Sequence, residues 1–166
     1  YLAFHKKYYH PSNSYLYLYG NMDMEEKLNW IDENYLSHFE KIEVDSDVRL
    51  QKPFAERKEE YGFYSVTEGE DTEGKAYFSY NTVCGDGLDR NLYRAFPVLS
   101  YVLVQSIGAP LKQALLDAGI GNDISCYYEE SVRQPFFSII AKNVKMEQKQ
   151  QFINVIETEL KKIVKE

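Results

Sequence analysis

The stretch from Gly108 to Ser125 constrains the fold more than any other, because it defines a short helix with a sharp stop at each end. Pro110 stands where a first helical residue belongs: its φ is already near the helical value, and it has no N–H group to leave unpaired. Apolar residues then follow at helical spacing on one face: Leu111, Ala114, Leu115 and Ala118. Gly119 is the expected left-handed cap, and residues 121–123 form a turn. A short helix with glycine on both flanks is typical of a place where another backbone comes close.

Around this helix the sequence predicts two pairs of strands and two longer helices. The predicted strands cover residues 60–67, 75–84, 123–132 and 134–141. One long helix begins after Asp89 and should continue through Pro97 with a kink or a lost hydrogen bond. The other covers residues 146–164, and its inner face is expected to carry Phe152, Ile153, Ile156, Leu160, Ile163 and Val164. This β-β-α-α-β-β-α order predicts an α+β fold, an antiparallel-rich sheet with helices packed on one face.

The first forty residues contain too little for a sheet of their own. They predict the end of a helix over residues 1–9, a strand over Tyr15–Tyr19 and a helix over residues 23–40 that Asp23 caps. A single strand cannot form a stable sheet, so we expect this segment to dock on something else. The mixed polar stretch that begins at Ile42 is expected to be a linker.

Length and charge exclude several classes of protein. The 166 residues suit one domain, or a domain plus a piece of another, and the chain does not begin with Met, so we expect a fragment. The formal net charge of −7 argues against nucleic acid or an anionic membrane as the main partner, because both attract basic surfaces. No apolar stretch is long enough for a membrane span. The 15 tyrosines favour half-exposed sheet faces and contact surfaces.

The residues that usually carry catalysis do not form a constellation. The three histidines, His5, His10 and His38, lack any metal-ligand spacing, so exposed histidines are expected. Cys84 and Cys126 are too few for a disulfide framework, and we expect two reduced thiols in an intracellular protein. Ser125-Cys126 is the most nucleophile-like position, but no histidine has a sequence reason to lie beside it. We therefore expect no catalytic residue and no metal ligand in this chain.

Two stretches resemble a family of peptidases. Phe4 to Asn13, followed by Leu16 to Asp23, resembles the end of the catalytic domain in pitrilysin- and insulinase-type zinc metallopeptidases. Gly108 to Ser125, together with Gln134 to Asn143, is similar to the second domain of the presequence-protease subfamily. The resemblance covers nearly the whole chain. It departs at Cys126, where a glycine is expected, and at Pro97, which interrupts a helix usually free of proline.

The resemblance implies an organisation and a role. Residues 1–41 would be the helix-strand-helix tail of the preceding catalytic domain, 42–57 a linker, and 58–166 a second, non-catalytic domain of the mitochondrial-processing-peptidase type. The family encloses peptides in a chamber made of two halves, and its zinc is held by an inverted His-x-x-Glu-His helix that is absent from this sequence. This segment alone is thus expected to be inactive, with zinc in the full-length parent only. The implied compartment is the bacterial cytoplasm, or an organelle matrix in a eukaryote.

In this family the second domain lines the chamber and helps to hold the substrate. The matching positions, and hence the expected peptide-binding residues, are Gly108, Ala109, Ser125, Cys126 and Tyr127. Partners implied are the peptide, the catalytic domain and the second half of the parent. Three alternatives stay open: that these residues only pack the sheet, that the chain is a stand-alone peptide-binding or self-association module using an exposed strand edge, and that Cys126 serves an independent enzyme.

Overall fold

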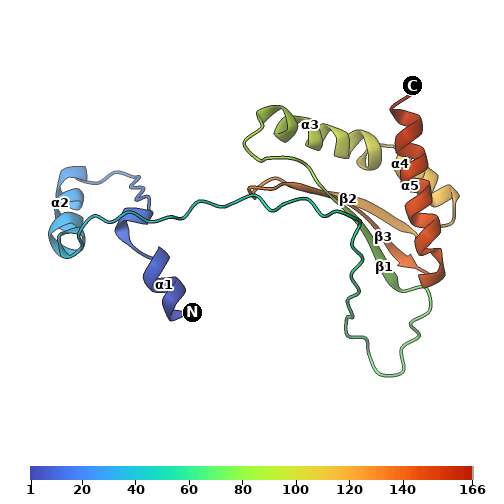
Figure 1. The fold of residues 1–166 in the computed structure, drawn as a ribbon, viewed down its shortest axis with the longest axis horizontal. Helices are drawn as coiled ribbons and strands as arrows, with labels where there is room; N and C mark the ends of the chain where they lie inside the picture. Colours follow the sequence, from blue (N-terminus) through green and yellow to red (C-terminus); the bar gives the residue numbers. More distant parts are fainter. Residues whose placement is uncertain (166) are drawn as a thin grey trace. The chain divides into compact units, whose positions relative to one another are not determined.

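A computed structural model describes residues 1–165 and divides the chain into two compact units, Tyr1–Arg49 and Leu50–Glu166 (Figure 1). The division falls within the stretch where the sequence predicts a linker. Each unit is considered separately below, and the assignment of the first to a catalytic domain stays a prediction.

Unit 1 has short helices and no core. Helix α1 covers Leu2–Tyr8, η1 covers Pro11–Asn13, α2 covers Met24–Asn34 and η2 covers Leu36–His38. The Asp23 carboxylate caps α2 by accepting a 2.9 Å hydrogen bond from the N–H of Glu26, as its sequence position predicts. The predicted strand over Tyr15–Tyr19 is wrong: no strand forms there, because this unit offers no neighbouring strand to pair with. No residue of unit 1 is buried.

Unit 2 is built on a three-stranded antiparallel sheet. Strands β1 (Ala76–Val83), β2 (Asp123–Glu129) and β3 (Phe136–Val144) are arranged in the order β1-β3-β2, so β3 is central and β2 is an edge strand. The register pairs Phe78 with Ala141, and Ala141 in turn with Ile124. Since side chains alternate along a strand, these three share one face of the sheet.

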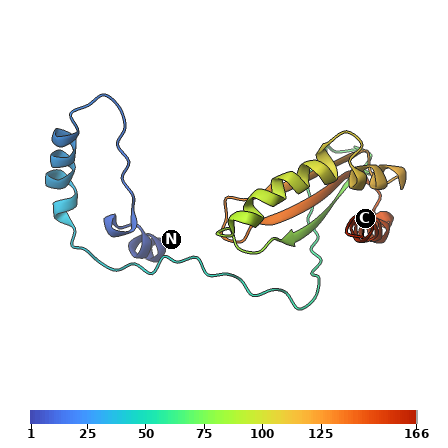
Figure 2. The ribbon, with the colours of Figure 1, turned by 90° about the horizontal axis from the view of Figure 1, so that it is seen from above.

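Helices α3 (Arg90–Ser100), α4 (Pro110–Asp117) and α5 (Lys149–Ile163) cover that one face, as predicted (Figures 1 and 2). Helix α3 continues through Pro97, as expected, and then widens into the π-helix η3 (Tyr101–Gln105). The short 3-10 helix η4 (Met146–Gln148) leads into α5. The glycine-flanked helix is α4, with Pro110 at its start and Gly119 just after its end at φ +69°.

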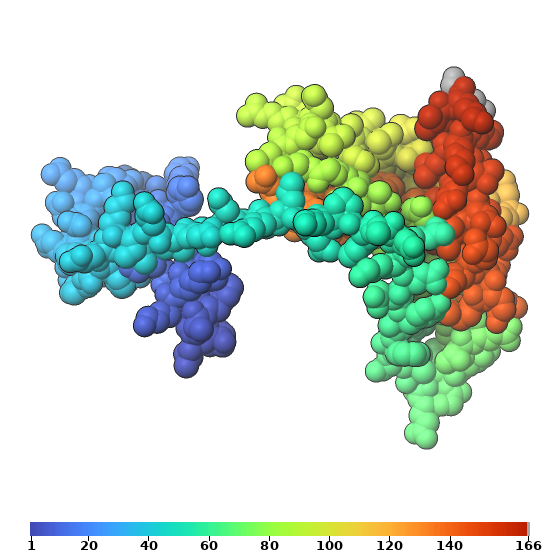
Figure 3. Space-filling view, viewed as in Figure 1, coloured from blue at the N-terminus to red at the C-terminus, as the bar shows by residue number. Residues whose placement is uncertain are grey.

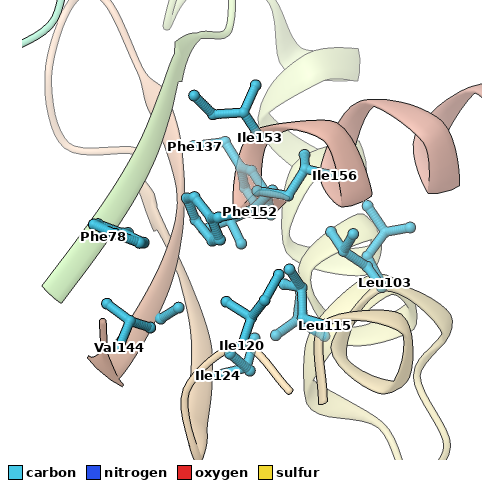
Figure 4. Close-up of a cluster of buried hydrophobic side chains, with 14 of the residues drawn as sticks. Phe78, Leu103, Leu115, Ile120, Ile124, Phe137, Val144, Phe152, Ile153 and Ile156 are labelled. Carbon is cyan, nitrogen blue, oxygen red and sulfur yellow. The ribbon is translucent and has the colours of Figure 1, made fainter. Parts of the chain in front are cut away.

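The core lies between the sheet and these helices (Figure 4). Its fully buried side chains come from the helices, the turn after α4 and the sheet; the largest are Leu111, Leu115, Ile120 and Ile156, followed by Val104 of η3 and Val144 of β3. Phe78 of β1 lies 5.5 Å from Phe152 of α5 between ring centroids. Burial confirms the expected inner face of α5 for Phe152, Ile153 and Ile156, but Val164 is exposed and its predicted burial is wrong. It follows the last residue of α5, where no part of the described sheet faces it.

The predicted strand over residues 60–67 is also wrong. The segment Leu50–Val66, here called the strap, contains no strand and is attached by side chains. Gln51 exchanges two hydrogen bonds with the Gln134 side chain, Arg57 pairs with Glu157 at 3.0 Å, and Glu59 pairs with Lys149 at 2.8 Å. Burial of one face is what fixes strand register, and the strap buries none: Phe63 is fully exposed.

Candidate peptide-binding surface

The face of the sheet away from the helices, here called the bare face, mixes polar and apolar side chains; it is exposed along β1 and at Asp123 and Tyr127, half-buried elsewhere, and buried at Ser138 in its centre. No described helix covers it, whereas the other face is filled by the core. By alternation it carries Tyr77, Ser79, Asn81, Val83, Asp123, Ser125, Tyr127, Glu129, Phe136, Ser138, Ile140 and Lys142, with Asp123 and Lys142 ion-paired at 2.9 Å. A sheet with one face packed on a core and the other left uncovered is the arrangement of a wall between a core and water.

Hydrogen bonds fix the polar side chains of the bare face in place. The Asn81 amide oxygen accepts from the hydroxyls of Ser79 at 2.8 Å and Ser138 at 2.5 Å, which links β1 to β3. The Tyr127 hydroxyl donates to the Glu129 carboxylate at 2.5 Å, and the Tyr127 ring meets Phe136 edge-on. Bonds between neighbours of this kind hold Tyr127 in one orientation on an otherwise open surface.

The same contacts shift two acid–base groups in opposite directions. Hydrogen bonds from Ser131, and then from Tyr127, lower the pKa of the Glu129 carboxyl. The bond to Glu129 raises the pKa of the Tyr127 phenol. Glu129 therefore stays charged and Tyr127 stays protonated at neutral pH, so the pair presents a fixed negative charge beside an aromatic ring.

The five predicted peptide-binding residues do not share one surface. Ser125 and Tyr127 lie on the bare face, where they pair across the sheet with Ile140 and Ser138. Cys126 points the other way: its sulfur lies 3.6 Å from both the Ser100 carbonyl oxygen and the Gln105 amide nitrogen. These neighbours are a carbonyl and an amide, and neither can serve as the base that a thiol nucleophile requires.

Gly108 and Ala109 form the turn between η3 and α4. Gly108 is exposed at φ +72°, and a side chain there would meet no neighbour, while Ala109 is buried. Both line an open cavity of about 220 Å³, together with Gln105, Ser106, Ile107, Lys112, Gln113 and Leu116. Gln105 contacts Cys126 as well as this cavity, so it connects the Gly108 turn with β2. Gln105 and Lys112 carry no sequence signal that would have selected them.

The substitution of cysteine for an expected glycine leaves the edge of β2 open. Because Cys126 points toward α3 and η3, its side chain occupies neither the bare face nor the line of backbone groups along the edge. The sequence alone could not show this, since it does not say which face a strand residue takes. Close approach of an extended peptide to β2 is thus compatible with Cys126.

The described residues carry no metal-binding chemistry. Across positions 1–165, no three His, Cys, Asp or Glu side chains are grouped so that they could hold a metal ion. No described helix is both long enough and apolar enough to cross a bilayer. Fold and site together define an α+β domain: a three-stranded sheet covered by helices on one face, with a bare second face and an edge strand that has no further partner among residues 1–165.

Comparison with known proteins identifies the family of this domain. The Peptidase M16 inactive domain matches residues 2–166. The chain is 46% identical over 164 residues to Protein HypA of Clostridium perfringens, covering 99% of this chain and 17% of that protein. It is 30% identical to the mitochondrial presequence protease of Xenopus tropicalis, covering 87% of this chain and 14% of that protein. For presequence protease 1 of Arabidopsis thaliana, chloroplastic/mitochondrial, the identity is 30%, over 98% of this chain and 15% of that protein.

The chain belongs to the M16 peptidase family and is a non-catalytic segment of it. It spans less than a fifth of the length of these curated relatives. The stretches on which the sequence resemblance rests, in both units, lie within the matched residues 2–166.

Proposed function

We propose that this chain is a chamber-forming, substrate-embracing segment of a zinc-dependent peptidase that degrades peptides. In this proposal the bare face is part of the chamber wall, and the substrate lies along β2. The observation that carries the proposal is the combination of a sheet face that no described helix covers with an edge strand whose outer side has no partner in the described chain.

An extended peptide can add to β2 as a further strand. Edge strands present unpaired N–H and C=O groups, and recognition by strand addition uses them for affinity while neighbouring side chains select the peptide. Ser125 and Tyr127 would contact the peptide from the bare face, and Gly108 from the turn near the end of η3, while the buried Ala109 would support that turn. Cys126 would support β2 from the opposite side of the sheet.

Charge favours a basic peptide. The chain carries a net charge of −7, and Glu129 keeps a negative charge next to Tyr127. Relatives in the family are presequence proteases, and transit peptides are rich in arginine and poor in acidic residues. We extend that substrate class to the parent of this chain because the opposite charges attract.

In this proposal the zinc site and the catalytic residues lie in other parts of the parent. No residue group of the described chain fits the metal, so the catalytic domain and the second half of the parent would supply the site and close the chamber. An intracellular compartment, the bacterial cytoplasm or an organelle matrix, completes the proposal. The 166-residue chain with zinc should cleave no fluorogenic peptide, while the parent should cleave it until a chelator is added. Chelator-sensitive cleavage by the short chain would overturn this assignment.

A matched pair of tyrosines tests the binding site. Tyr127 on β2 and Tyr77 on β1 lie on the same bare face and are 51% and 53% exposed. In the full-length parent, Tyr127→Ala should raise the KM for an arginine-rich peptide about tenfold with kcat little changed, because it removes one aromatic contact worth about 1–1.5 kcal/mol. Tyr77→Ala, at the opposite edge, should leave KM within about twofold, well inside 0.5 kcal/mol. Equal effects from both variants would contradict binding along β2.

The alternative is a stand-alone module that binds peptides or itself through an exposed strand edge. The free edge of β2 and the exposed residues Tyr15, Tyr17 and Tyr19 favour it. Size-exclusion chromatography with light scattering separates the two: a concentration-independent monomer that binds no peptide would leave the alternative without support.

A further inference from the structure

Helix α3 continues into a segment that is apolar on every side. From Ala95 to Val104 the sequence contains no charged residue, and Ser100 is its only hydroxyl apart from the Tyr101 phenol. A surface helix normally has a charged or polar face toward water, and a helix that is hydrophobic all round is normally buried. This segment of α3 and η3 therefore has more apolar surface than its own core contact requires.

The structure divides these residues into two opposite sets. The inward set packs on the sheet: Phe96 stacks on Tyr128 at 5.0 Å, and Ser100, Leu103 and Val104 are buried. The outward set is exposed and consists of Val98 (62%), Leu99 (42%), Tyr101 (60%) and Val102 (48%). We call this outward set the α3 ridge. In the view of Figure 3 no other segment of unit 2 covers α3.

The second half of the ridge lies in the π-helix η3. The N–H of Ser106 donates to the Tyr101 carbonyl, five residues back, at 2.8 Å. Within this wider turn Leu103 and Val104 both enter the core, while Tyr101 and Val102 both stay outside. Single π-turns in α-helices are frequent at functional positions. The fully exposed Ile107 follows directly, so the apolar surface continues to the Gly108 turn.

Two arginines lie at the N-terminal end of the ridge. Arg90 and Arg94 lie in the first turns of α3, and neither has an ion-pair partner among residues 1–165. An occupant of the ridge should then be apolar along its centre and carry carboxylates opposite the two arginines. A convex helix without a free backbone edge suits the groove between two helices, not an added strand.

We propose that the α3 ridge docks against another segment of the same full-length polypeptide, one that presents an uncharged apolar groove with an acidic rim. The chain spans 14–17% of the length of the relatives described above, so most of such a polypeptide lies outside these residues. Contiguous exposed apolar patches in proteins mark interaction surfaces. The ridge lies on the helical side of the sheet, opposite the bare face, so this proposal does not depend on peptide binding.

Oxidative footprinting of the full-length parent tests the ridge at Tyr101. In the described chain the Tyr101 side chain is 60% exposed. If nothing covers the ridge in the parent, Tyr101 should be oxidised at more than half the rate found in urea. Burial at the centre of an interface should instead lower the rate to about a tenth or less of the urea value. A rate in the native parent near that in urea overturns the proposal. A tenfold protection that disappears on dilution, with dissociation seen by light scattering, assigns the ridge to a second copy and overturns it equally.

A charge introduced into the ridge gives a second, independent measurement. Val98 and Val83 are similarly exposed, at 62% and 57%, on opposite sides of unit 2. Val98→Glu in the parent should restore the oxidation of Tyr101 several-fold, and Val83→Glu should leave it unchanged. Equal oxidation of Tyr101 in both variants and in the unmodified parent contradicts docking at Val98. Peptide KM is read on the Val98→Glu sample, and loss of ridge protection with KM unchanged separates this proposal from the one on β2.

Discussion

The two units have similar apolar side chains and use them differently. In unit 2, Leu115 and Ile156 are completely buried between sheet and helices. In unit 1, Leu28 and Trp30 lie on a well-capped helix and remain 51% and 61% exposed. Local signals suffice to form α2, but only a sheet gives apolar residues a surface to pack on. The comparison favours the prediction that unit 1 docks on another surface to bury these side chains, and its place in a catalytic domain stays a prediction.

The largest expected difference between the units comes from removing buried leucine atoms. Leu115→Ala should lower the free energy of unfolding by about 3 kcal/mol, since it leaves a cavity in a packed core. Leu28→Ala, at a half-exposed position, should change it by less than about 0.5 kcal/mol. Urea unfolding followed by circular dichroism measures both. A comparable loss from Leu28→Ala would mean that unit 1 has a core of its own.

Next in size is a pair of glycine substitutions around the turn after α4. Both Gly119 and Gly121 have positive φ, +69° and +64°. At Gly119 a side chain meets open space, so Gly119→Ala should cost about 1 kcal/mol through backbone strain alone. At Gly121 a side chain would collide with the Lys142 carbonyl oxygen, so Gly121→Ala should cost about 3 kcal/mol.

The same urea experiment ranks the two glycine variants. Equal costs would mean that the backbone of β3 moves away from residue 121 without penalty. Unit 1 offers no equivalent test, because Gly20 lies beside only the flexible end of Met22. The difference in unfolding free energy between the two glycine variants therefore measures how tightly unit 2 alone is packed.

The sequence predicted those elements whose signals are local. Pro110, the apolar face from Leu111 to Ala118 and Gly119 determine α4 by capping and periodicity, and the structure has it there. Alternation places β1 within one residue at each end of the predicted strand, and Phe152 and Ile156 of α5 are buried as expected. Each of these depends on residues no more than a few positions apart.

The failures share a physical cause: they depend on distant neighbours. Tyr15–Tyr19 and residues 60–67 alternate like strands, yet neither has a partner strand, and a strand without one gains no ladder hydrogen bonds. The π-turn after α3 depends on which side of the helix meets β2. For the candidate site, residues 125–127 were identified, but which of them face the helices follows from the register with β3. The bare face, which joins residues from three strands, has no signal within any one of them.

The Cys84 thiol can be used to measure whether the core of unit 2 opens to solvent. Burial raises the pKa of the Cys84 thiol above its ordinary value, because the charged thiolate loses its water. The folded state thus holds this proton more tightly than the unfolded state. The associated stability is complete below the ordinary pKa of about 9 and is lost as pH rises through the higher folded value.

Alkylation followed by mass spectrometry measures that difference. At pH 8 the Cys84 thiol should react much more slowly than in urea, since it is both buried and protonated. Urea midpoints for the unmodified chain should fall as pH rises above about 9, and Cys84→Ala should remove part of that fall. Alkylation of Cys84 at the urea rate would show that unit 2 is as open as unit 1.

The smallest effect concerns the strap, which lies in unit 2 but is as exposed as unit 1. Its ion pairs, Arg57–Glu157 and Glu59–Lys149, involve side chains 36–50% exposed, and each should contribute less than about 1 kcal/mol. Arg57→Gln should therefore change the unfolding free energy by a few tenths of a kcal/mol, and salt should screen even that. Hydrogen exchange measures the local consequence: the exposed amides of residues 55–61, which donate to no described acceptor, should exchange near the unprotected rate with or without 1 M salt, while those of β3 stay protected. Because Gln51 is held to Gln134 by neutral hydrogen bonds, its amide should keep its protection in salt. Protection of residues 55–61 that is as strong as in β3 and insensitive to salt would show that the strap forms the fourth strand of the sheet in solution.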